Sequence, residues 1–278
     1  MEIQIKILQF FEQIRTETLT LLMTTITIMA ESLFIVAILA GLYWCVDKIK
    51  SKRLAWFVLF NFVGNGMIKN LIQMPRPFDL GVVKPIRAET ATSFSFPSGH
   101  TQTATSFWSG AMLVLRTKGM YVMGSCIILL TALSRVYLGV HWPMDVLGGI
   151  FFGVIFTLLA NKLLGDKGEI KPVHVIGVSI VVLLVMIFKV DADLYKGAAA
   201  LWGMTCGAYI EQKYIQFEAV QNWRIQLKKI LIGFGGLVLI YLILSKVLPA
   251  VKIVKMIKYA LLLLWITAGA PFIFKKLK

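Results

Sequence analysis

Three short polar blocks stand at the ends of long apolar runs, where helices that cross a bilayer would emerge. They bring together one lysine, two arginines, two histidines and one aspartate, namely Lys69, Arg76, Arg135, His100, His141 and Asp145. If the apolar runs cross the membrane in alternating directions, all three blocks emerge on the same face. Ionisable residues in or beside a membrane span indicate function by default, because they are costly to place there. The sequence therefore predicts one shared polar site at a membrane surface.

The cations of these blocks suit an anion with several oxygen atoms. Lys69, Arg76 and Arg135 have a single carboxylate among them, so phosphate is the obvious ligand. A helix is predicted to begin after Ser98, which can cap it, while Gly99 lets the backbone approach a ligand closely. The free N–H groups of the first turn would then point at the anion. This predicts a phosphate site that needs no metal and no other cofactor.

The two histidines suggest how a bound phosphate would react. His141 and Asp145 are four residues apart, so they share a face if the turn is already helical. A carboxylate on one ring nitrogen fixes the tautomer and leaves the other nitrogen free as a nucleophile. His100 would lie across the phosphate and protonate the leaving oxygen. The predicted intermediate is a phosphohistidine that water hydrolyses.

Each of these residues also has a purely structural explanation. Lys69 could extend to the headgroups, and Arg76 and Arg135 could anchor helices at the membrane edge. His100 could be a helix-start residue, His141 could be an interfacial turn residue, and Asp145 could complement the positive end of its own helix. One shared site accounts for all of them at once, and it is the interpretation adopted here.

The composition is that of an integral membrane protein. Of 278 residues, 58% are hydrophobic and 15% are charged, against about 45–50% and about 25% in soluble domains. This excludes a disordered chain, a disulfide-stapled secreted domain and a soluble nucleic-acid binder. The net charge of +15 falls mostly in short segments between apolar runs, and no basic stripe carries interleaved aromatics, so no nucleic-acid partner is expected. The three cysteines are isolated from one another and indicate neither a disulfide framework nor a metal site.

The apolar runs predict an all-α, polytopic transmembrane helical bundle of about nine spans. They are roughly residues 19–46, 53–74, 98–115, 119–138, 143–164, 173–190, 195–211, 229–248 and 256–274. An amphipathic helix over residues 1–18 is predicted to lie in the membrane interface. Residues 19–165 form a predicted five-span core that carries the site. Residues 172–278 add further spans of unknown role.

The distribution of lysine and arginine among the loops predicts the orientation of these spans in the membrane. Most lie in alternate loops and in the C-terminal tail, which the positive-inside rule assigns to the cytoplasm. The amino terminus and the predicted site then lie on the non-cytoplasmic face. One loop disagrees, because Lys246, Lys252, Lys255 and Lys258 fall outside. Either that loop lies flat on the membrane or the number of spans is wrong near the end.

The three blocks resemble the signature of the type 2 phosphatidic acid phosphatase superfamily, which is K-x6-RP, then PSGH, then SR-x5-H-x3-D. The chain matches every position in order, with Lys69-x6-Arg76-Pro77, Pro97-Ser98-Gly99-His100 and Ser134-Arg135-x5-His141-x3-Asp145. The resemblance covers about residues 50–165 and implies a helical bundle that hydrolyses phosphate esters without a metal. It makes His141 the nucleophile, Asp145 its orienting partner and His100 the general acid. It assigns phosphate binding to Lys69, Arg76, Ser98, Gly99 and Arg135.

The predicted layout differs from that of the simplest bacterial members, which resemble a six-span bundle. Nine spans with an external amino terminus are similar to the glucose-6-phosphatases and, more loosely, to the sphingosine-phosphate phosphatases of the same superfamily. This puts the substrate in doubt but not the chemistry. The related vanadate-dependent haloperoxidases are mostly soluble, and the membrane composition argues against that branch.

The leading hypothesis is a membrane phosphatase for a lipid phosphate or diphosphate ester, such as undecaprenyl diphosphate or phosphatidylglycerol phosphate. Its expected partners are the lipid substrate and the bilayer, and a bacterial cell membrane is the expected location. The oligomeric state is left open. Alternatives are a membrane phosphatase of a soluble sugar phosphate, or a phosphate-binding or transport protein without turnover. A side opening between spans would favour a lipid, and a cavity open only to water would favour a sugar.

A few charged residues outside the signature are left without a role. Glu31, near the centre of the first predicted span, could line a substrate path, pair with a cation or simply pack. Lys84 and Arg87 precede the PSGH block and could meet an anionic headgroup or merely form a solvated loop face. His174 lies far from the site face in the predicted topology and is assigned no function.

Overall fold

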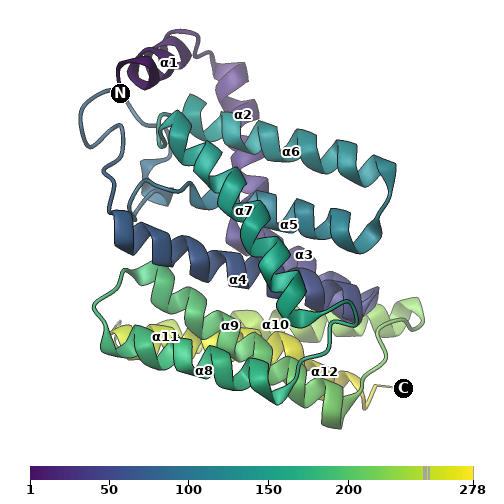
Figure 1. Ribbon diagram of the computed structural model, residues 1–278. Helices are drawn as coiled ribbons and strands as arrows, with labels where there is room; N and C mark the ends of the chain where they lie inside the picture. Colours follow the sequence, from purple (N-terminus) through teal and green to yellow (C-terminus); the bar gives the residue numbers. More distant parts are fainter. Residues whose placement is uncertain (247–248, 250, 278) are drawn as a thin grey trace. The chain divides into compact units, whose positions relative to one another are not determined.

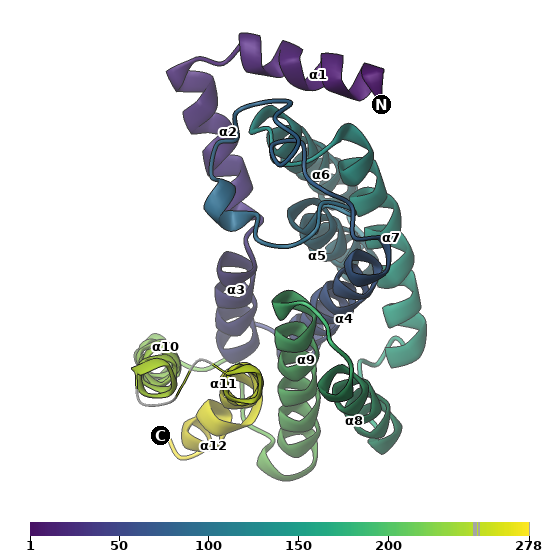
Figure 2. The same cartoon turned by 90° about the vertical axis from the view of Figure 1, so that its left-hand side faces the viewer.

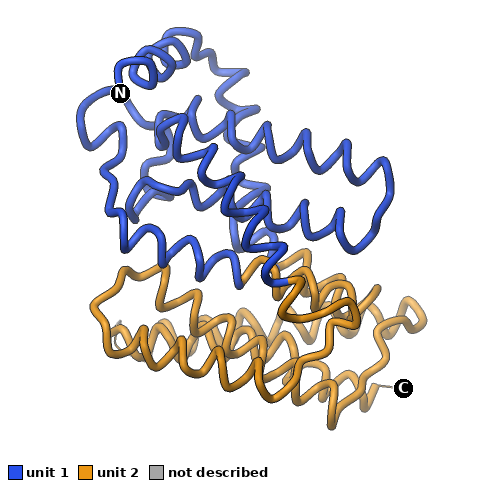
Figure 3. The backbone as a smooth tube through the Cα atoms, in the orientation of Figure 1, with its two compact units in different colours: residues 1–36, 60–160 blue, residues 37–59, 161–278 orange. Residues whose placement is uncertain are grey.

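The computed structural model describes residues 1–246, 249 and 251–277. Over these residues it consists of helices and connecting loops without β-strands, which confirms the predicted all-α class. The chain divides into two compact units, Met1–Val36 with Phe60–Ala160 and Ala37–Leu59 with Asn161–Lys278 (Figure 3). All eight residues predicted to form the site lie in the first unit. The site can therefore be described within one unit.

The first unit contains the helices that carry the three polar blocks and the helices that precede them in the chain (Figure 1). In chain order these are α1 (Glu2–Gln13), α2 (Glu17–Met29), the start of α3 (Ser32–Cys45), the end of α4 (Lys48–Ile72), a 3₁₀ turn (Ala88–Thr90), α5 (Gly99–Leu115), α6 (Lys118–Tyr137) and most of α7 (Pro143–Leu164). Helices α5 and α6 lie side by side, and α1 and α2 both pack on α6. The long connection between α4 and α5 carries no regular structure beyond the 3₁₀ turn, so its backbone groups are free to hold side chains.

Helix α1 is shorter than the amphipathic segment predicted over residues 1–18, because it ends at Gln13 and α2 begins at Glu17. Its Leu8 is only 1% exposed and packs in a cluster with Val83 and Trp142, beside the third polar block. A second contact follows α1, where Arg15 Nη1 donates to the carbonyl of Lys84 at 2.7 Å. The amino-terminal segment is thus packed against the connection before α5, and its membrane location remains a prediction.

The first predicted span, residues 19–46, is not one continuous helix. It is broken between α2 and α3, whose axes differ by 51°. Glu31 lies at this break and makes an ion pair with Arg87, 2.9 Å from Oε1 to Nη2. Hydropathy alone treats Glu31 as an isolated charge within one span. In the structure, Glu31 lies where the straight apolar helix ends.

The number of spans is not settled by the helices themselves. Among the described residues, α6, α7, α10 (Trp223–Lys246) and the run Lys252–Phe274 are long and apolar enough to cross a bilayer, and the bent α2–α3 pair would be a fifth. Helix α8 (Pro172–Ile187) is apolar but shorter. Nine spans therefore remains a prediction. Residues 247 and 248, which close the eighth predicted span, lie outside the described residues.

The second unit packs its helices through close backbone contact. Helix α9 (Ala192–Ile210) lies against α8 and against α11 (Lys252–Leu264) (Figure 2). A Cβ atom on Gly203 would lie 2.0 Å from the carbonyl oxygen of Ala260, and one on Gly207 would lie 2.0 Å from Thr267 Oγ1. Small residues at this spacing let two membrane helices approach closely. This Gly-x3-Gly motif was not recognised from the sequence.

Gly203→Leu is expected to destabilise the protein, because the new side chain meets the backbone of α11. Overpacking costs typically about 1–3 kcal/mol, so the melting temperature in detergent should fall by about 5 °C or more. Gly235→Leu on α10 is the matched control, because nothing lies within 4 Å of the position that a Cβ atom would take there. Equal melting temperatures for the two variants would contradict this account of the packing.

Candidate active site

The phosphate-binding end of α5 is held by its cap. Ser98 is the N-cap residue, and its Oγ accepts hydrogen bonds from Thr101 Oγ1 at 3.0 Å and from the Thr101 N–H at 3.5 Å. The Ser98 N–H in turn donates to the main-chain oxygen of Asp145 at 2.9 Å. The first-turn N–H groups, which include those of Gly99 and His100, have no acceptor within their own helix. These contacts place the start of α5 beside the start of α7.

Two glycines of α7 allow that approach. A Cβ atom on Gly149 would lie 3.0 Å from the Ser98 oxygen, and one on Gly153 would lie 2.6 Å from Thr105 Cβ. These glycines were not singled out from the sequence. Their spacing, Gly149-x3-Gly153 within an apolar run, was the available signal. Close packing of α7 on α5 thus helps to position the PSGH block.

His141 and Asp145 form the predicted pair. His141 Nδ1 is 3.1 Å from Asp145 Oδ2, although His141 lies in the turn before α7. The same carboxylate oxygen accepts from the Trp142 N–H at 2.8 Å and from Ser95 Oγ at 2.5 Å. Both residues of the pair are almost completely buried. Three donors thus fix the Asp145 carboxylate, and Ser95 is a positioning residue without any signal in the sequence motif.

The tautomer of His141 follows from its second contact. Arg76 Nη1 lies 3.2 Å from His141 Nε2. A guanidinium group can only donate, so Nε2 must accept and the ring proton belongs on Nδ1, facing Asp145. Burial lowers the pKa of His141 well below its usual value, and the positive charges of Arg76, Arg135 and Lys69 lower it further. The imidazole is therefore neutral, with Nε2 bearing the lone pair that a nucleophile needs.

Main-chain carbonyls of the connection between α4 and α5 hold two of the cations. Arg76 Nε donates to the Ser93 oxygen at 2.7 Å, and its Nη1 donates to the Val140 oxygen at 2.8 Å. The Phe94 oxygen accepts from Arg76 Nη2 at 3.3 Å and also from Lys69 Nζ. Both side chains are buried. The connection before the PSGH block thus orients Lys69 and Arg76 toward the site.

One edge of the Arg135 guanidinium group has no hydrogen-bond partner. Its Nη1 donates to Thr27 Oγ1 of α2 at 2.7 Å, whereas its Nε and Nη2 are buried without a hydrogen-bond partner. Nε and Nη2 form one side of the guanidinium plane, which is the fork that binds oxyanions through two parallel hydrogen bonds. His100 Nε2 is likewise buried without a partner. Buried donors are normally satisfied, so these atoms indicate a site made to receive an anion.

The structure therefore brings the predicted site residues to one region of the first unit. His141 contacts Arg76 and Asp145 directly, and the start of α5 is joined to Asp145 through the backbone. His100 lies in the first turn of α5 and Arg135 in the last turn of α6, and these two helices pack on each other. Their catalytic roles remain predictions. Within the described residues, no three His, Cys, Asp or Glu side chains cluster as metal ligands would.

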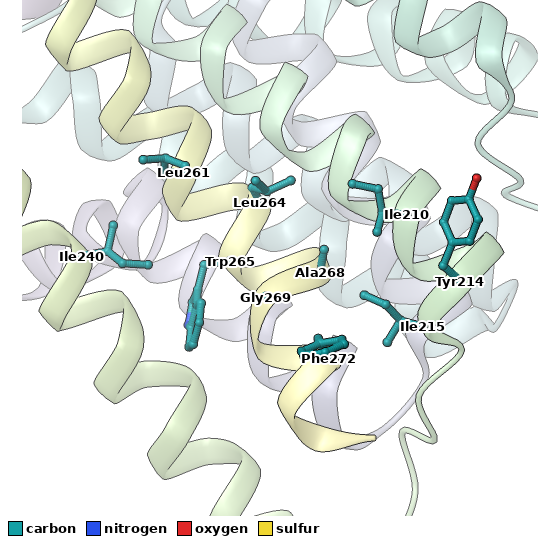
Figure 4. Close-up of a pocket in the computed structure, with 10 residues that line it drawn as sticks. All are labelled: Ile210, Tyr214, Ile215, Ile240, Leu261, Leu264, Trp265, Ala268, Gly269 and Phe272. Atoms are coloured by element: carbon teal, nitrogen blue, oxygen red, sulfur yellow. The ribbon is translucent and has the colours of Figure 1, made fainter. Parts of the chain in front are cut away.

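A large hollow lies elsewhere, in the second unit. It has a cavity volume of about 710 Å³. Its lining comes from the end of α9, from the π-helical turn Glu211–Ile215, from α10 and from the α11–α12 run, where α12 is Ala270–Phe274 (Figure 4). Trp265 is one of the lining residues, and its Nε1 donates to the Gly233 oxygen at 2.9 Å. The side chains lining it include no histidine, aspartate, glutamate, lysine or arginine. An apolar lining of this kind suits a hydrocarbon chain and offers no ionisable acid or base for catalysis.

The fold and the site define an all-helical membrane protein with a buried histidine–aspartate pair and an oxyanion fork. The chain belongs to the PAP2 superfamily. The model of that superfamily matches residues 50–169, and a second model, described as the transmembrane extension of PAP2 superfamily phosphatases, matches residues 195–278. This confirms the family resemblance that the three blocks carry. It also assigns the additional C-terminal helices to a recognised extension.

Curated relatives and a solved structure are also similar to the chain. The undecaprenyl-diphosphatase of Sulfolobus acidocaldarius is 33% identical over 38% of this chain and 50% of its own length. The human sphingosine-1-phosphate phosphatase 2 is 28% identical over 47% of this chain and 34% of its own length. The chain thus spans half of the first relative and about a third of the second. The crystal structure of a PAP2-type phosphatidylglycerolphosphate phosphatase from Bacillus subtilis is 30% identical, with a TM-score of 0.49 over 58% of this chain and 84% of that one.

Proposed function

We propose that this protein is an integral membrane phosphatase that hydrolyses a lipid phosphate or diphosphate ester through a phosphohistidine intermediate, without a metal. The observation that carries the proposal is the buried His141, whose Nδ1 faces Asp145 and whose Nε2 faces Arg76. The open fork of Arg135 in the same unit supports it. The two curated relatives support the lipid class, because their names state activity on a lipid diphosphate and on a sphingosine phosphate. The long apolar helices support a substrate that enters from the bilayer.

The reaction has two steps. Phosphate oxygens occupy the Arg135 fork and the first-turn N–H groups of α5, and Arg76 moves from His141 Nε2 onto the phosphate. His100 takes up a proton as the anionic phosphate binds and offsets the neighbouring cations. The Nε2 lone pair then attacks phosphorus, the bond from phosphorus to the ester oxygen breaks, and His100 gives that proton to the leaving oxygen. Water next attacks phosphorus and passes a proton to His100, the bond from phosphorus to His141 Nε2 breaks, and phosphate leaves. The fixed cations stabilise the charge on the transferring group throughout, which is the main contribution in phosphoryl transfer.

The first test is release of inorganic phosphate by the purified protein in detergent, with a chelator present. Wild type is expected to release phosphate from lipid phosphates faster than from glucose 6-phosphate, and vanadate should inhibit because it adopts the five-coordinate geometry of the transferring group. Preference for the sugar phosphate would favour the soluble-substrate alternative. No release from either class, with or without chelator, would favour a binding or transport protein. Loss of activity in chelator alone would contradict the metal-free mechanism.

We also propose that the site faces the non-cytoplasmic side of a bacterial cell membrane. The distribution of lysine and arginine between the predicted spans supports this orientation. In sealed spheroplasts, an impermeant short-chain lipid phosphate added outside should be hydrolysed as fast as after permeabilisation. Hydrolysis only after permeabilisation would reverse the orientation.

The pH profile should report the environment of His141. Because its pKa is lowered by burial and by neighbouring cations, Nε2 stays unprotonated to more acidic pH, and kcat/KM falls only below that pKa. Arg76→Gln removes the largest of those charges, so its residual activity should show an acid midpoint at higher pH than wild type. Both profiles use the same substrate, so titration of the substrate cancels in the comparison. Coincident acid midpoints would contradict the assignment of His141 as the titrating nucleophile.

A further inference from the structure

An arginine outside the signature lies next to the site. Arg87, which precedes the 3₁₀ turn before α5, makes an ion pair with Glu31 at the α2–α3 break, 2.9 Å from Nη2 to Oε1, and its Nε lies 3.6 Å from Glu89 Oε1. The side chains of Arg87 and Glu31 are 22% and 29% exposed, so the pair is largely buried. Arg87 has φ of 61°, a left-handed conformation that is uncommon for a residue with a side chain. Tertiary contacts therefore hold Arg87 in place.

The segment that carries Arg87 packs next to the segment that carries Arg135. The Ile86 N–H donates to the Leu138 oxygen at 2.9 Å, three residues after Arg135. Thr27 Oγ1 accepts from Arg135 Nη1 at 2.7 Å, and Glu31, which pairs with Arg87, follows Thr27 by four residues. Both arginines are therefore held by the same short stretch of chain at the end of α2.

One donor of Arg87 has no acceptor. Nη2 is paired with Glu31 and Nε faces Glu89, whereas Nη1 is buried without a hydrogen-bond partner. A buried guanidinium N–H without an acceptor is costly unless a ligand supplies one. Arg87 and Arg135, whose open fork is described above, thus both present buried donors without a hydrogen-bond partner. A single phosphoryl group bound at Arg135 leaves the donor of Arg87 unused.

The leaving group decides whether a second cation is useful. In a monophosphate ester the leaving oxygen belongs to an alcohol, which needs a proton from His100 but carries no other charge. In a diphosphate ester, breaking the bond from the terminal phosphorus to the bridging oxygen leaves the electron pair on a lipid monophosphate, which is already anionic. A cation on that side binds the second phosphate and stabilises it as it departs.

We propose that Arg87, held by Glu31, is the residue that binds the second phosphate and makes the site selective for diphosphate over monophosphate esters. This rests on the proposed phosphatase function and narrows its substrate class. Arg87 would touch the phosphate that stays on the lipid, with Nη1 as the donor. Glu31 acts through Arg87 by orienting its guanidinium group.

The test compares two substrates with the same chain, farnesyl diphosphate and farnesyl monophosphate, in detergent with the purified full chain. Arg87→Gln is expected to lower kcat/KM for the diphosphate by about 10- to 100-fold, the size of one charge-assisted hydrogen bond, and to change the monophosphate value less than about threefold. Lys84→Gln is the matched control, because it removes an exposed lysine from the same connection and should change neither. Equal losses on both substrates, or no loss on either, would overturn the proposal.

A binding measurement keeps the test independent of turnover and folding. Methylenediphosphonate, which has two linked phosphorus groups, should inhibit wild type more strongly than inorganic phosphate does, and Arg87→Gln should abolish this difference. Arg87→Lys keeps the charge but loses the planar fork, so it should retain part of the diphosphate preference with an unchanged melting temperature. A folded Arg87→Lys that loses both activities equally would show a structural role instead. Failure of wild type on both substrates would refute the phosphatase function itself rather than the role of Arg87.

Discussion

Replacing His141 with alanine is expected to lower phosphate release by at least about 10⁴-fold, the size of loss seen when a covalent nucleophile is removed. The ring is buried and neutral, and its Nδ1 is committed to Asp145, so Nε2 alone is available to form the bond to phosphorus. Phosphate release from a lipid phosphate and the acid-labile phosphoprotein trapped in a single turnover both measure this. Both signals should disappear together.

The matched control is His174→Ala. His174 belongs to the second unit, where its Nδ1 accepts from the Lys171 N–H at 2.9 Å at the start of α8. Loss of that contact should leave phosphate release within about twofold of wild type. A His141→Ala protein that is folded and keeps more than about one hundredth of wild-type activity would overturn the nucleophile assignment.

Replacing His100 with alanine is expected to have an effect that depends on the leaving group. A general acid contributes about 10²- to 10⁴-fold, so hydrolysis of an alkyl phosphate should fall by roughly 10³-fold. An aryl phosphate with an activated leaving group needs little protonation and should lose less than about tenfold. The basis is His100 Nε2, which is buried without a hydrogen-bond partner in the first turn of α5 and is therefore available to an ester oxygen.

Ser109→Ala controls for general disturbance of α5, because its hydroxyl donates only to the Thr105 oxygen of the same helix. It should affect both substrates equally and slightly. If His100→Ala lowers alkyl and aryl phosphate hydrolysis by the same factor, then His100 binds phosphate or supports the fold, and another group is the acid.

The second unit was the least predictable part of the chain. Its apolar runs indicated helices, but they could not show that Gly203 and Gly207 bring α9 against α11. Hydropathy also predicted one straight first span, whereas the helix is broken at Glu31, which pairs with Arg87. Both failures have the same cause: the partner lies more than fifty residues away in the sequence, and a local pattern carries no information about it.

By itself, the sequence determined the helical class, the family and the residue types at the centre of the site. These depend on local relationships: the length of apolar runs, a serine that caps the helix it precedes, and a histidine four residues before an aspartate. Only the tertiary structure decided which side chains from other parts of the chain contact these residues. Ser95 donates to Asp145, Thr27 accepts from one end of Arg135, and Arg87 pairs with Glu31, each through a contact between distant segments. Such contacts form because buried polar groups must find acceptors or donors wherever the folded chain brings them, and no spacing in the sequence specifies that partner.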